Sequence, residues 1–256
     1  MEQDLIRIVS ANGYNLRYIE NQTEEICIAA VTNNHIALKY VIEQTEEICI
    51  AAVRANPNCL GDVINQTEEI CLMAVGRLGC SLQYVREQTE EICLEAVKQC
   101  GCALEHVKDQ TEEICLEAVR NMPQSFTYVK KQTEAICITA MMLDHSLFSS
   151  IVDPTEEMYL IALRHNPHLL TRIEHQTEAM CIEAVKVNSY ALRNVKDQTE
   201  AVCVAAIDNS RNLTNKDDTS IDIEHLLTSI RDEDLREQMR SYSKGKRFMR
   251  TKSAKK

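Results

Sequence analysis

Tryptophan is absent from this chain of 256 residues, which also has only three phenylalanines, six glycines and four prolines. Few large aromatic side chains are available, so the core must use Ile, Leu, Val, Ala and Cys, which suits closely packed helices. No apolar run approaches the roughly 20 residues of a membrane-spanning helix. Met1–Asn12 also lacks the basic and then apolar pattern of a secretory signal. The sequence therefore predicts a soluble intracellular protein.

Catalytic motifs are missing as well. The sequence has no Gly-rich phosphate loop and no recognisable pairing of a nucleophile with a general base. We therefore expect a protein that is not an enzyme and that uses no cofactor. Residues 1–207 carry 16 basic and 30 acidic residues, a net charge of −14, whereas residues 208–256 carry 12 and 9, a net charge of +3. Because phosphates bind through Lys and Arg, nucleic acid or an anionic surface could be bound only through the C-terminal tail.

What the sequence does contain is a repeat. The six residues Gln-Thr-Glu-Glu-Ile-Cys recur every 22 residues, beginning at Gln22, Gln44, Gln66, Gln88 and Gln110. Softer copies on the same step begin at Gln132, Pro154, Gln176 and Gln198. Such a period is typical of solenoids, in which each unit contacts only its neighbours. The expected fold class is all-α, an α-solenoid of stacked helix–turn–helix repeats with a C-terminal helix and a basic tail.

Residues 23–44 represent one complete unit. Thr23 is suited to cap a helix because its hydroxyl can accept a hydrogen bond from a free N–H of the first turn. The acidic residues that follow it favour the positive end of the helix dipole. The helix is expected to end near Asn33 and Asn34, since Asn tolerates the left-handed conformation that ends many helices. A second helix of about six residues should follow, with an apolar pair three residues apart at Leu38 and Val41.

The repeats are expected to occupy residues 1–207, with a truncated first unit. The repeat pattern stops after Ile207, and residues 208–219 are polar and read as a linker. An amphipathic helix is predicted over residues 220–239. Residues 240–256 contain eight basic and no acidic residues, so we expect a flexible basic tail there.

The unit resembles an uncharacterised family of tandem helical repeats, a domain of unknown function abundant in giant DNA viruses of amoebae and in some intracellular bacteria. The resemblance is carried by the start Thr-Glu-Glu-Ile-Cys-Ile-x-Ala-Val, the Asn or Gly turn and the second helix Ala-Leu-x-Tyr-Val, over residues 1–207. It implies a helical array in a viral protein that acts in an infected cell. The host cytoplasm is then the expected location, with the nucleus and the virion as alternatives. Gln-Thr replaces the acidic cap that is frequent in the family, and the unit around Pro154 is irregular.

Twelve cysteines form two groups. Eight share one repeat position, and equivalent residues of stacked helices lie about 9–10 Å apart, too far for a disulfide. They read as small buried hydrophobic residues. The other four, Cys59, Cys80, Cys100 and Cys102, lie near turns of three consecutive units. Four thiolates can hold zinc, but only Cys100 and Cys102 are close in sequence, so we expect ordinary free thiols.

Two further sets of polar residues have structural explanations. The repeated Glu pairs, such as Glu24 and Glu25, suit a helix start; as a catalytic pair they would need two different environments, which a repeat does not supply. Their remaining use is an acidic stripe that attracts basic partners. His145, His165, His168 and His175 cluster around the irregular unit, but no carboxylate or Cys is clearly placed to complete a metal site.

Binding is expected on the tail or on the first helix of each repeat. On that helix, side chains at positions i, i+4 and i+7 face the same way, and we call this face the outward stripe. The stripe is charged in the middle units and turns apolar or small at Ala51, Met73, Ala135, Met142 and Ile161. Tyr159 stands where other units have Cys; it is either absorbed by repacking or forms a bend or contact patch. In the tail, Lys244, Lys246, Arg247 and Arg250 could contact nucleic acid, an anionic surface or an acidic protein, or serve in nuclear import.

The function predicted from these features is a non-enzymatic scaffold that binds a partner protein along the solenoid surface. The alternative is a structural component of a virion or larger assembly, formed by self-association of the acidic body with the basic tail.

Overall fold

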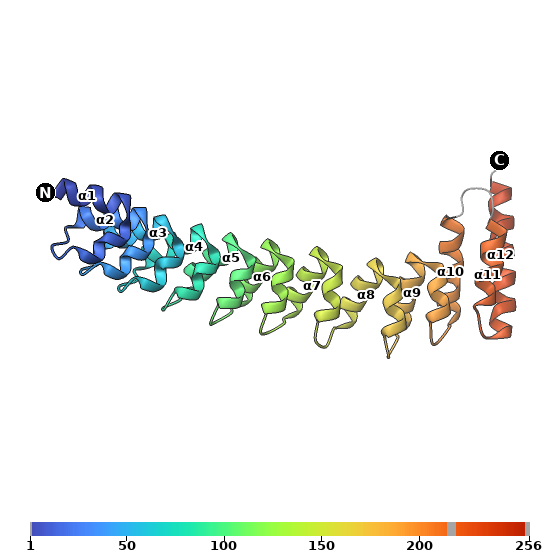
Figure 1. Ribbon diagram of the computed structural model, residues 1–256. Coiled ribbons are helices and arrows are strands. Elements are labelled where there is room, and N and C mark those ends of the chain that lie inside the picture. Colours follow the sequence, from blue (N-terminus) through green and yellow to red (C-terminus); the bar gives the residue numbers. More distant parts are fainter. Residues whose placement is uncertain (1, 214–218, 254–256) are drawn as a thin grey trace. The chain divides into compact units, whose positions relative to one another are not determined.

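The computed structural model describes the backbone of residues 2–213 and 219–253, and within that range all side chains except those of residues 211–222 and 245–253. All elements in these ranges are helices, and in the repeats α-helices alternate with 3-10 helices, written η (Figure 1). The predicted all-α solenoid with a 22-residue period is confirmed. The chain divides into two units, Met1–Ser150 and Ile151–Lys256.

The first unit contains seven helix pairs. They are α1 Glu2–Ala11, η1 Gly13–Tyr18, α2 Glu24–Asn33, η2 His35–Tyr40, α3 Glu46–Ala55, η3 Pro57–Asp62, α4 Glu68–Arg77, η4 Gly79–Tyr84, α5 Glu90–Gln99, η5 Gly101–His106, α6 Glu112–Asn121, η6 Pro123–Tyr128, α7 Glu134–Leu143 and η7 His145–Ser150.

The second unit continues the repeat and then departs from it. Its elements are α8 Glu156–His165, η8 Pro167–Arg172, α9 Glu178–Val187, η9 Ser189–Asn194, α10 Glu200–Leu213, α11 Thr219–Thr228 and α12 Glu233–Ser253.

The predicted threonine caps are present at eight of the nine repeat starts. In α2, the hydroxyl of Thr23 accepts a hydrogen bond from the backbone N–H of Ile26. Equivalent bonds occur at Thr45, Thr67, Thr89, Thr111, Thr155, Thr177 and Thr199. Thr133 is the exception, since its side chain makes no capping bond to α7. A short polar side chain thus fixes where almost every first helix begins.

The expected left-handed end of the first helix is wrong. Asn34 is extended, with φ −147° and ψ 106°, and its side chain accepts a hydrogen bond from the N–H of Ile36. The same residue therefore ends α2 and begins η2. No left-handed turn is needed because the chain passes directly from one helix into the other.

The second helix of each unit is a 3-10 helix. The N–H of Val41 donates to the carbonyl of Leu38, three residues earlier. With three residues per turn, residues three apart lie on one face. This explains the apolar pair three residues apart, because Leu38 and Val41 both face the core, and both are buried.

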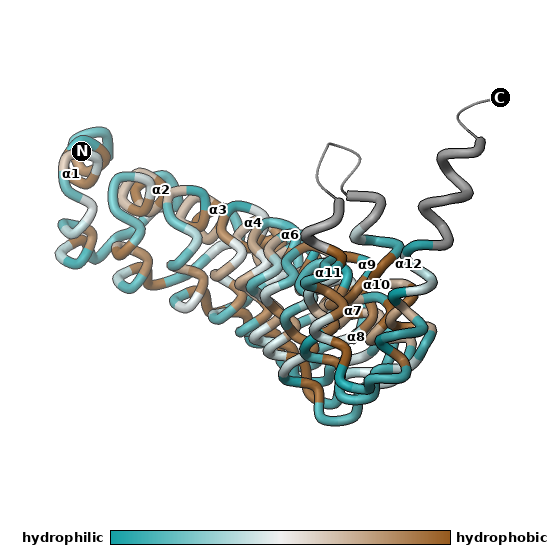
Figure 2. Tube along the Cα trace, turned by 90° about the vertical axis from the view of Figure 1, so that its right-hand side faces the viewer, coloured by the Kyte–Doolittle hydropathy of each residue, from teal (hydrophilic) through white to brown (hydrophobic). Residues whose placement is uncertain are grey.

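Burial follows the repeat in the first unit. In α2, Ile26, Cys27, Ala30 and Val31 are buried, and the corresponding four positions are buried in α3 to α7. Consecutive α-helices of this unit contact one another, as do consecutive η helices. In Figure 2 the loops at the lower edge are mainly teal, whereas brown residues are concentrated in the helices. The core is thus continuous from one repeat to the next.

The second unit has its own core, and α11 and α12 cover the last repeat. Ile223, Leu226, Leu227 and Ile230 are buried with the apolar residues of α9 and α10, and Met239 of α12 joins them. Tyr159 and Leu160 pack against this core and are half-buried. The large side chain at the Cys position is therefore partly buried against this core.

The C-terminal segment has two helices where one is expected over residues 220–239. After α11, the N–H groups of Ser229 and Ile230 donate to carbonyls three residues earlier, which tightens and ends the helix. The side chain of Asp232 then accepts a hydrogen bond from the N–H of Leu235 at 2.7 Å and starts α12. Helix α12 continues to Ser253, within the stretch expected to be a flexible tail. Parts of the predicted linker and tail, residues 214–218 and 254–256, lie outside the described residues.

The helices that the structure describes include none with the length and apolar character needed to span a membrane.

Candidate functional site

One glutamine per repeat joins consecutive units at their loops. The side-chain amide of Gln22 donates to the carbonyls of Leu16 and Tyr40, at 3.3 and 2.9 Å. Its oxygen accepts the backbone N–H of Ile42 at 3.0 Å. Gln22 therefore binds its own unit and the next one at once. We call this arrangement the glutamine clamp.

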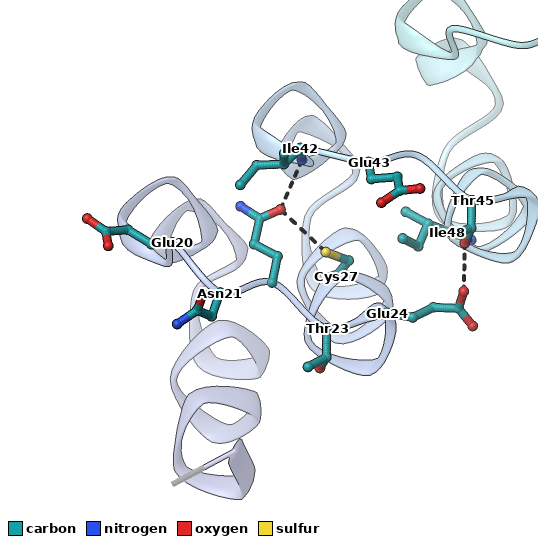
Figure 3. A pocket seen from close by; sticks show the side chains of 10 residues that line it. Glu20, Asn21, Thr23, Glu24, Cys27, Ile42, Glu43, Thr45 and Ile48 are labelled. Carbon is teal, nitrogen blue, oxygen red and sulfur yellow. Dashed lines mark hydrogen bonds between the residues drawn. The ribbon is translucent and has the colours of Figure 1, made fainter.

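The clamp also explains the cysteine ladder. The thiol of Cys27 donates to the same Gln22 oxygen at 3.6 Å (Figure 3). The corresponding pair recurs at Cys49, Cys93, Cys115, Cys137 and Cys181. All twelve cysteines are free thiols. The ladder residues are buried as predicted. Six of the eight also donate a hydrogen bond, a role that their hydrophobic character alone does not reveal.

The glutamate ladder bonds consecutive helices. The hydroxyl of Thr45 donates to a carboxylate oxygen of Glu24, in the preceding repeat, at 2.9 Å (Figure 3). The same contact joins Thr23 to Glu2, Thr67 to Glu46, Thr89 to Glu68, Thr111 to Glu90, Thr133 to Glu112 and Thr177 to Glu156. The glutamate beside the helix start thus acts across the repeat boundary, which supports a structural role for this row.

A shallow depression opens beside the clamp. It has a volume of about 390 Å³ and is lined by Gln22, Cys27, Glu43, Thr45 and Ile48 among others. Two periods along the chain, an equivalent depression of about 300 Å³ is lined by Gln66, Cys71 and Glu87. The same part of the repeat therefore presents a recess to solvent at both places.

Exposed apolar and acidic side chains border these depressions. Ile42 and Ile64 are 71% and 62% exposed and occupy one repeat position. Glu20 and Glu43 are exposed beside the first depression, and Glu87 beside the second. We call these five residues the loop edge. Its members lie on loops and not on the outward stripe of the first helices.

In the three repeats after that of Ile64, the same repeat position is occupied by basic residues, Arg86, Lys108 and Lys130. The guanidinium of Arg86 donates to the carbonyls of Ile64 and Val63, at 2.7 and 2.8 Å. The ammonium groups of Lys108 and Lys130 make similar bonds to the preceding loop. These cations tie loops together, whereas the side chains of Ile42 and Ile64 extend into solvent.

The binding residues predicted on the outward stripe are dispersed in the structure. Met73 lies half-buried on α4, while Ala135 and the 68%-exposed Met142 lie three repeats later on α7. The repeat position of Met73 is taken by Glu95 in α5 and by Glu117 in α6. The three residues therefore do not form one apolar surface in the first unit, and binding there remains a prediction.

In the second unit, Ile161 and Tyr159 are half-buried on α8. Lys244 is exposed on α12. The side chains of Lys246, Arg247 and Arg250 lie outside the described residues.

Three of the four turn cysteines come together. The sulfur atoms of Cys100 and Cys102 are 2.7 Å apart, and those of Cys80 and Cys102 are 3.4 Å apart. All three thiols are half-buried. The hydrogen bond with Cys102 lowers the pKa of Cys100, and the same bond together with burial raises the pKa of Cys102 to about 12. Cys100 is therefore the first of this pair to become a thiolate.

Cys59 does not join this group, because it occupies a different repeat position. It is equivalent to the buried Ala37 and Ala103, and it faces the core. Burial raises its pKa to about 12. Among the residues that the structure describes, Cys80, Cys100 and Cys102 form the only close group of possible metal ligands. The predicted histidine cluster is not such a group.

Comparison with known proteins adds one match. A family model described as a domain of unknown function, DUF4116, matches residues 67–111 and 89–133. The two matches begin 22 residues apart, in step with the repeat. This part of the chain is therefore similar to an uncharacterised repeat domain, in agreement with the resemblance described above. No curated protein and no solved structure matches the chain.

Proposed function

We propose that the chain is a non-enzymatic scaffold and that a partner protein binds along the loop edge of the first unit. The observation that carries this proposal is the exposure of Ile42 and Ile64 beside recesses of about 390 and 300 Å³. These two large apolar side chains occupy equivalent positions of adjacent repeats, and exposed apolar groups on a solenoid surface suit an extended partner. The acidic residues Glu20, Glu43 and Glu87 favour a partner segment that carries basic side chains as well as apolar ones.

Within each repeat, some positions join neighbouring repeats and another is exposed and variable, and this difference supports a binding role. The Gln, Thr and Cys positions are occupied by contacts that join repeats, whereas the position of Ile42 differs from unit to unit. It is Glu20, Ile42, Ile64, Arg86, Lys108 and Lys130 in the first unit. A fixed frame with one variable exposed position is how repeat proteins present different chemistry along one surface.

The repeated carboxylates support a role without catalysis. General acid–base catalysis by two carboxyl groups requires environments that separate their pKa values. Glu24, Glu46, Glu68 and Glu90 instead each accept a hydrogen bond from the threonine of the next repeat. Equivalent surroundings give no basis for different roles.

Self-association into a larger assembly is the less favoured reading. Solenoids stack end to end when a terminal repeat leaves its apolar face open. In the second unit, α11 and α12 cover the last repeat, and Leu226, Leu227 and Ile230 are buried there. This end is therefore closed to another copy. We also propose that the scaffold is a viral protein, as the family resemblance implies.

Affinity capture with matched variants tests the proposal. The full chain, the double variant Ile42→Asp/Ile64→Asp and the variant Val152→Asp would be immobilised and exposed to a lysate of the native host. Val152 is 71% exposed at the same repeat position but lies in the second unit, so it controls for added charge. All three substitutions affect exposed side chains, and circular dichroism would confirm that each variant folds.

We expect a protein captured by the full chain and by Val152→Asp but lost with the double variant. Its direct binding would then be measured with both proteins purified. Equal capture by all three chains would overturn the assignment to the loop edge. A concentration-dependent increase in mass by light scattering, abolished by Ile42→Asp/Ile64→Asp, would instead show that this surface binds a second copy.

A further inference from the structure

The three clustered thiols are brought together by the repeat itself. Cys80 and Cys102 are the second residues of η4 and η5, and they are one period apart. Cys100 is the residue immediately before η5, and its side chain makes no capping hydrogen bond. Because η4 and η5 are in contact, residues at one repeat position lie beside each other. The cluster therefore joins two consecutive repeats through their second helices.

Glycine at position 79 permits the close approach. A Cβ atom at this position would lie 2.4 Å from the carbonyl oxygen of Ala96 and 3.1 Å from Cβ of Cys100. Any side chain there would push η4 away from the end of α5. Gly79 thus lets the loop of Cys100 lie against the start of η4, next to Cys80.

The three sulfur atoms are close enough together to share one metal ion. A tetrahedral ion with metal–sulfur bonds of about 2.3 Å separates its sulfur ligands by about 3.8 Å. The three sulfur atoms all lie within 4.8 Å of one another, with separations of 2.7 and 3.4 Å for two of the pairs. Rotation of the side chains would have to widen the two short separations for the three thiolates to surround one ion.

Accessibility separates these thiols from the other nine. The ladder cysteines and Cys59 are buried, whereas Cys80, Cys100 and Cys102 are half-buried. An ion can therefore reach the cluster from solvent, and the protons that it displaces can leave. We propose that Cys80, Cys100 and Cys102 bind one thiophilic d10 metal ion, Zn²⁺ or Cu⁺, and thereby cross-link the fourth and fifth repeats.

Binding exchanges three S–H protons for three metal–sulfur bonds, so each ion bound releases up to three protons and no electron is transferred. Three thiolates satisfy a trigonal Cu⁺ ion completely, while Zn²⁺ keeps one position for water or another ligand. Thiolate ligands also exclude Mg²⁺ and Ca²⁺, which require oxygen donors. The site is therefore selective by ligand chemistry and does not depend on the protein's acidic surface.

The test uses the reduced full chain, freed of metal by chelation, and the variants Cys80→Ser, Cys102→Ser and Cys115→Ala. Cys115 belongs to the buried ladder and serves as the matched control. Zn²⁺ and Cu⁺ would each be titrated under anaerobic conditions. Native mass spectrometry would give the stoichiometry, and a pH indicator would measure the protons released.

We expect one ion per chain for the wild type and for Cys115→Ala. Affinity should be at least about 100-fold weaker for each of the other two variants, because removing a ligand should cost at least as much as the roughly 10–100-fold lost when a residue that only orients a ligand is removed. Thermal unfolding should also shift upward on metal addition only in the chains that bind. Failure of both ions to bind the reduced wild type would overturn the proposal. So would binding of the ion by Cys80→Ser and Cys102→Ser with the affinity of the wild type, because the ion would then lie elsewhere.

Discussion

Arg231 donates its backbone N–H to the side-chain oxygen of Gln198 at 2.9 Å, and this bond reproduces at the C-terminal end the clamp that joins the repeats. The amide of Gln198 donates to the carbonyl of Ser229 at 3.0 Å. In the preceding repeat, Gln176 makes the same two contacts with Lys196 and Asn194. The α11–α12 loop therefore stands where the loop of a further repeat would lie.

The side chain of Arg231 extends this similarity. Its guanidinium donates to the carbonyls of Val195 and Lys196, at 2.8 and 3.1 Å. Arg86 and Lys108 bond the preceding loop in the same way in the first unit. Arg231→Ala should lower the unfolding free energy by about 1–3 kcal/mol, because it removes charge-assisted hydrogen bonds.

Arg231→Lys provides the matched control. Lysine already occupies the corresponding position at Lys108, Lys130 and Lys196, so it should restore most of the stability. Chemical denaturation followed by circular dichroism would measure all three chains. Equal loss in both variants would show that these bonds to the loop carbonyls do not stabilise the C-terminal end.

The glutamine clamp should be a major source of coupling between repeats. Gln110→Ala removes donation to the carbonyls of Leu104 and Tyr128 and acceptance from Lys130. With about 1 kcal/mol per hydrogen bond, a loss of about 2–4 kcal/mol is expected. Gln124→Ala, which removes one exposed contact to Asp144, should cost under about 0.5 kcal/mol. Similar unfolding midpoints for the two variants would contradict the clamp.

Two buried serines should be replaceable with a gain in stability. The hydroxyl groups of Ser81 and Ser125 are buried and have no hydrogen-bond partner among the described residues. The same repeat position holds Ala37 and Ala103. Ser81→Ala should therefore raise the unfolding free energy by about 1 kcal/mol, because an unsatisfied polar group is removed without leaving a large cavity. Exposed Ser149 supplies a control substitution to Ala; a lower melting temperature for Ser81→Ala would count against this argument.

The cysteine ladder should make the fold sensitive to alkali. Burial raises the pKa of Cys27, Cys181 and Cys203 to about 11, from an ordinary value of 9.0. Between these values the unfolded chain loses thiol protons that the native chain keeps, so stability is fully present below pH 9 and falls as pH rises toward 11. The melting temperature should decline over this range. A variant with all three residues changed to Ala should decline less steeply, and an unchanged slope would refute the role of the ladder.

Much of the architecture can be read from the sequence because every unit repeats the same local chemistry. Thr23 predicts the start of the first helix and Leu38 predicts the second helix, because each prediction depends only on neighbouring residues in the sequence. The clamp is harder to predict, because Gln22 acts on Tyr40 and Ile42 in the next unit, and nothing local shows those contacts.

The thiol cluster could have been found by aligning repeats. Cys80 and Cys102 share one position, which places them side by side, whereas Cys59 aligns with buried Ala37 and must face the core. The approach of Cys100 depends on the path of the loop against Gly79, and spacing alone does not supply this. The exposure of the loop edge is hard to predict for a similar reason, because Ile42 lies after η2 and before α3, outside the two helices that define the repeat.

The most direct test of the central claim is hydrogen exchange of the chain with its purified partner, followed by mass spectrometry. A partner on the loop edge should slow exchange of backbone amides in the loops at residues 19–23, 41–45 and 63–67. Val152→Asp should show the same protection, and Ile42→Asp/Ile64→Asp should show none. Protection confined to α12, or to the outward surface of α4 and α7, would contradict the loop edge as the binding surface.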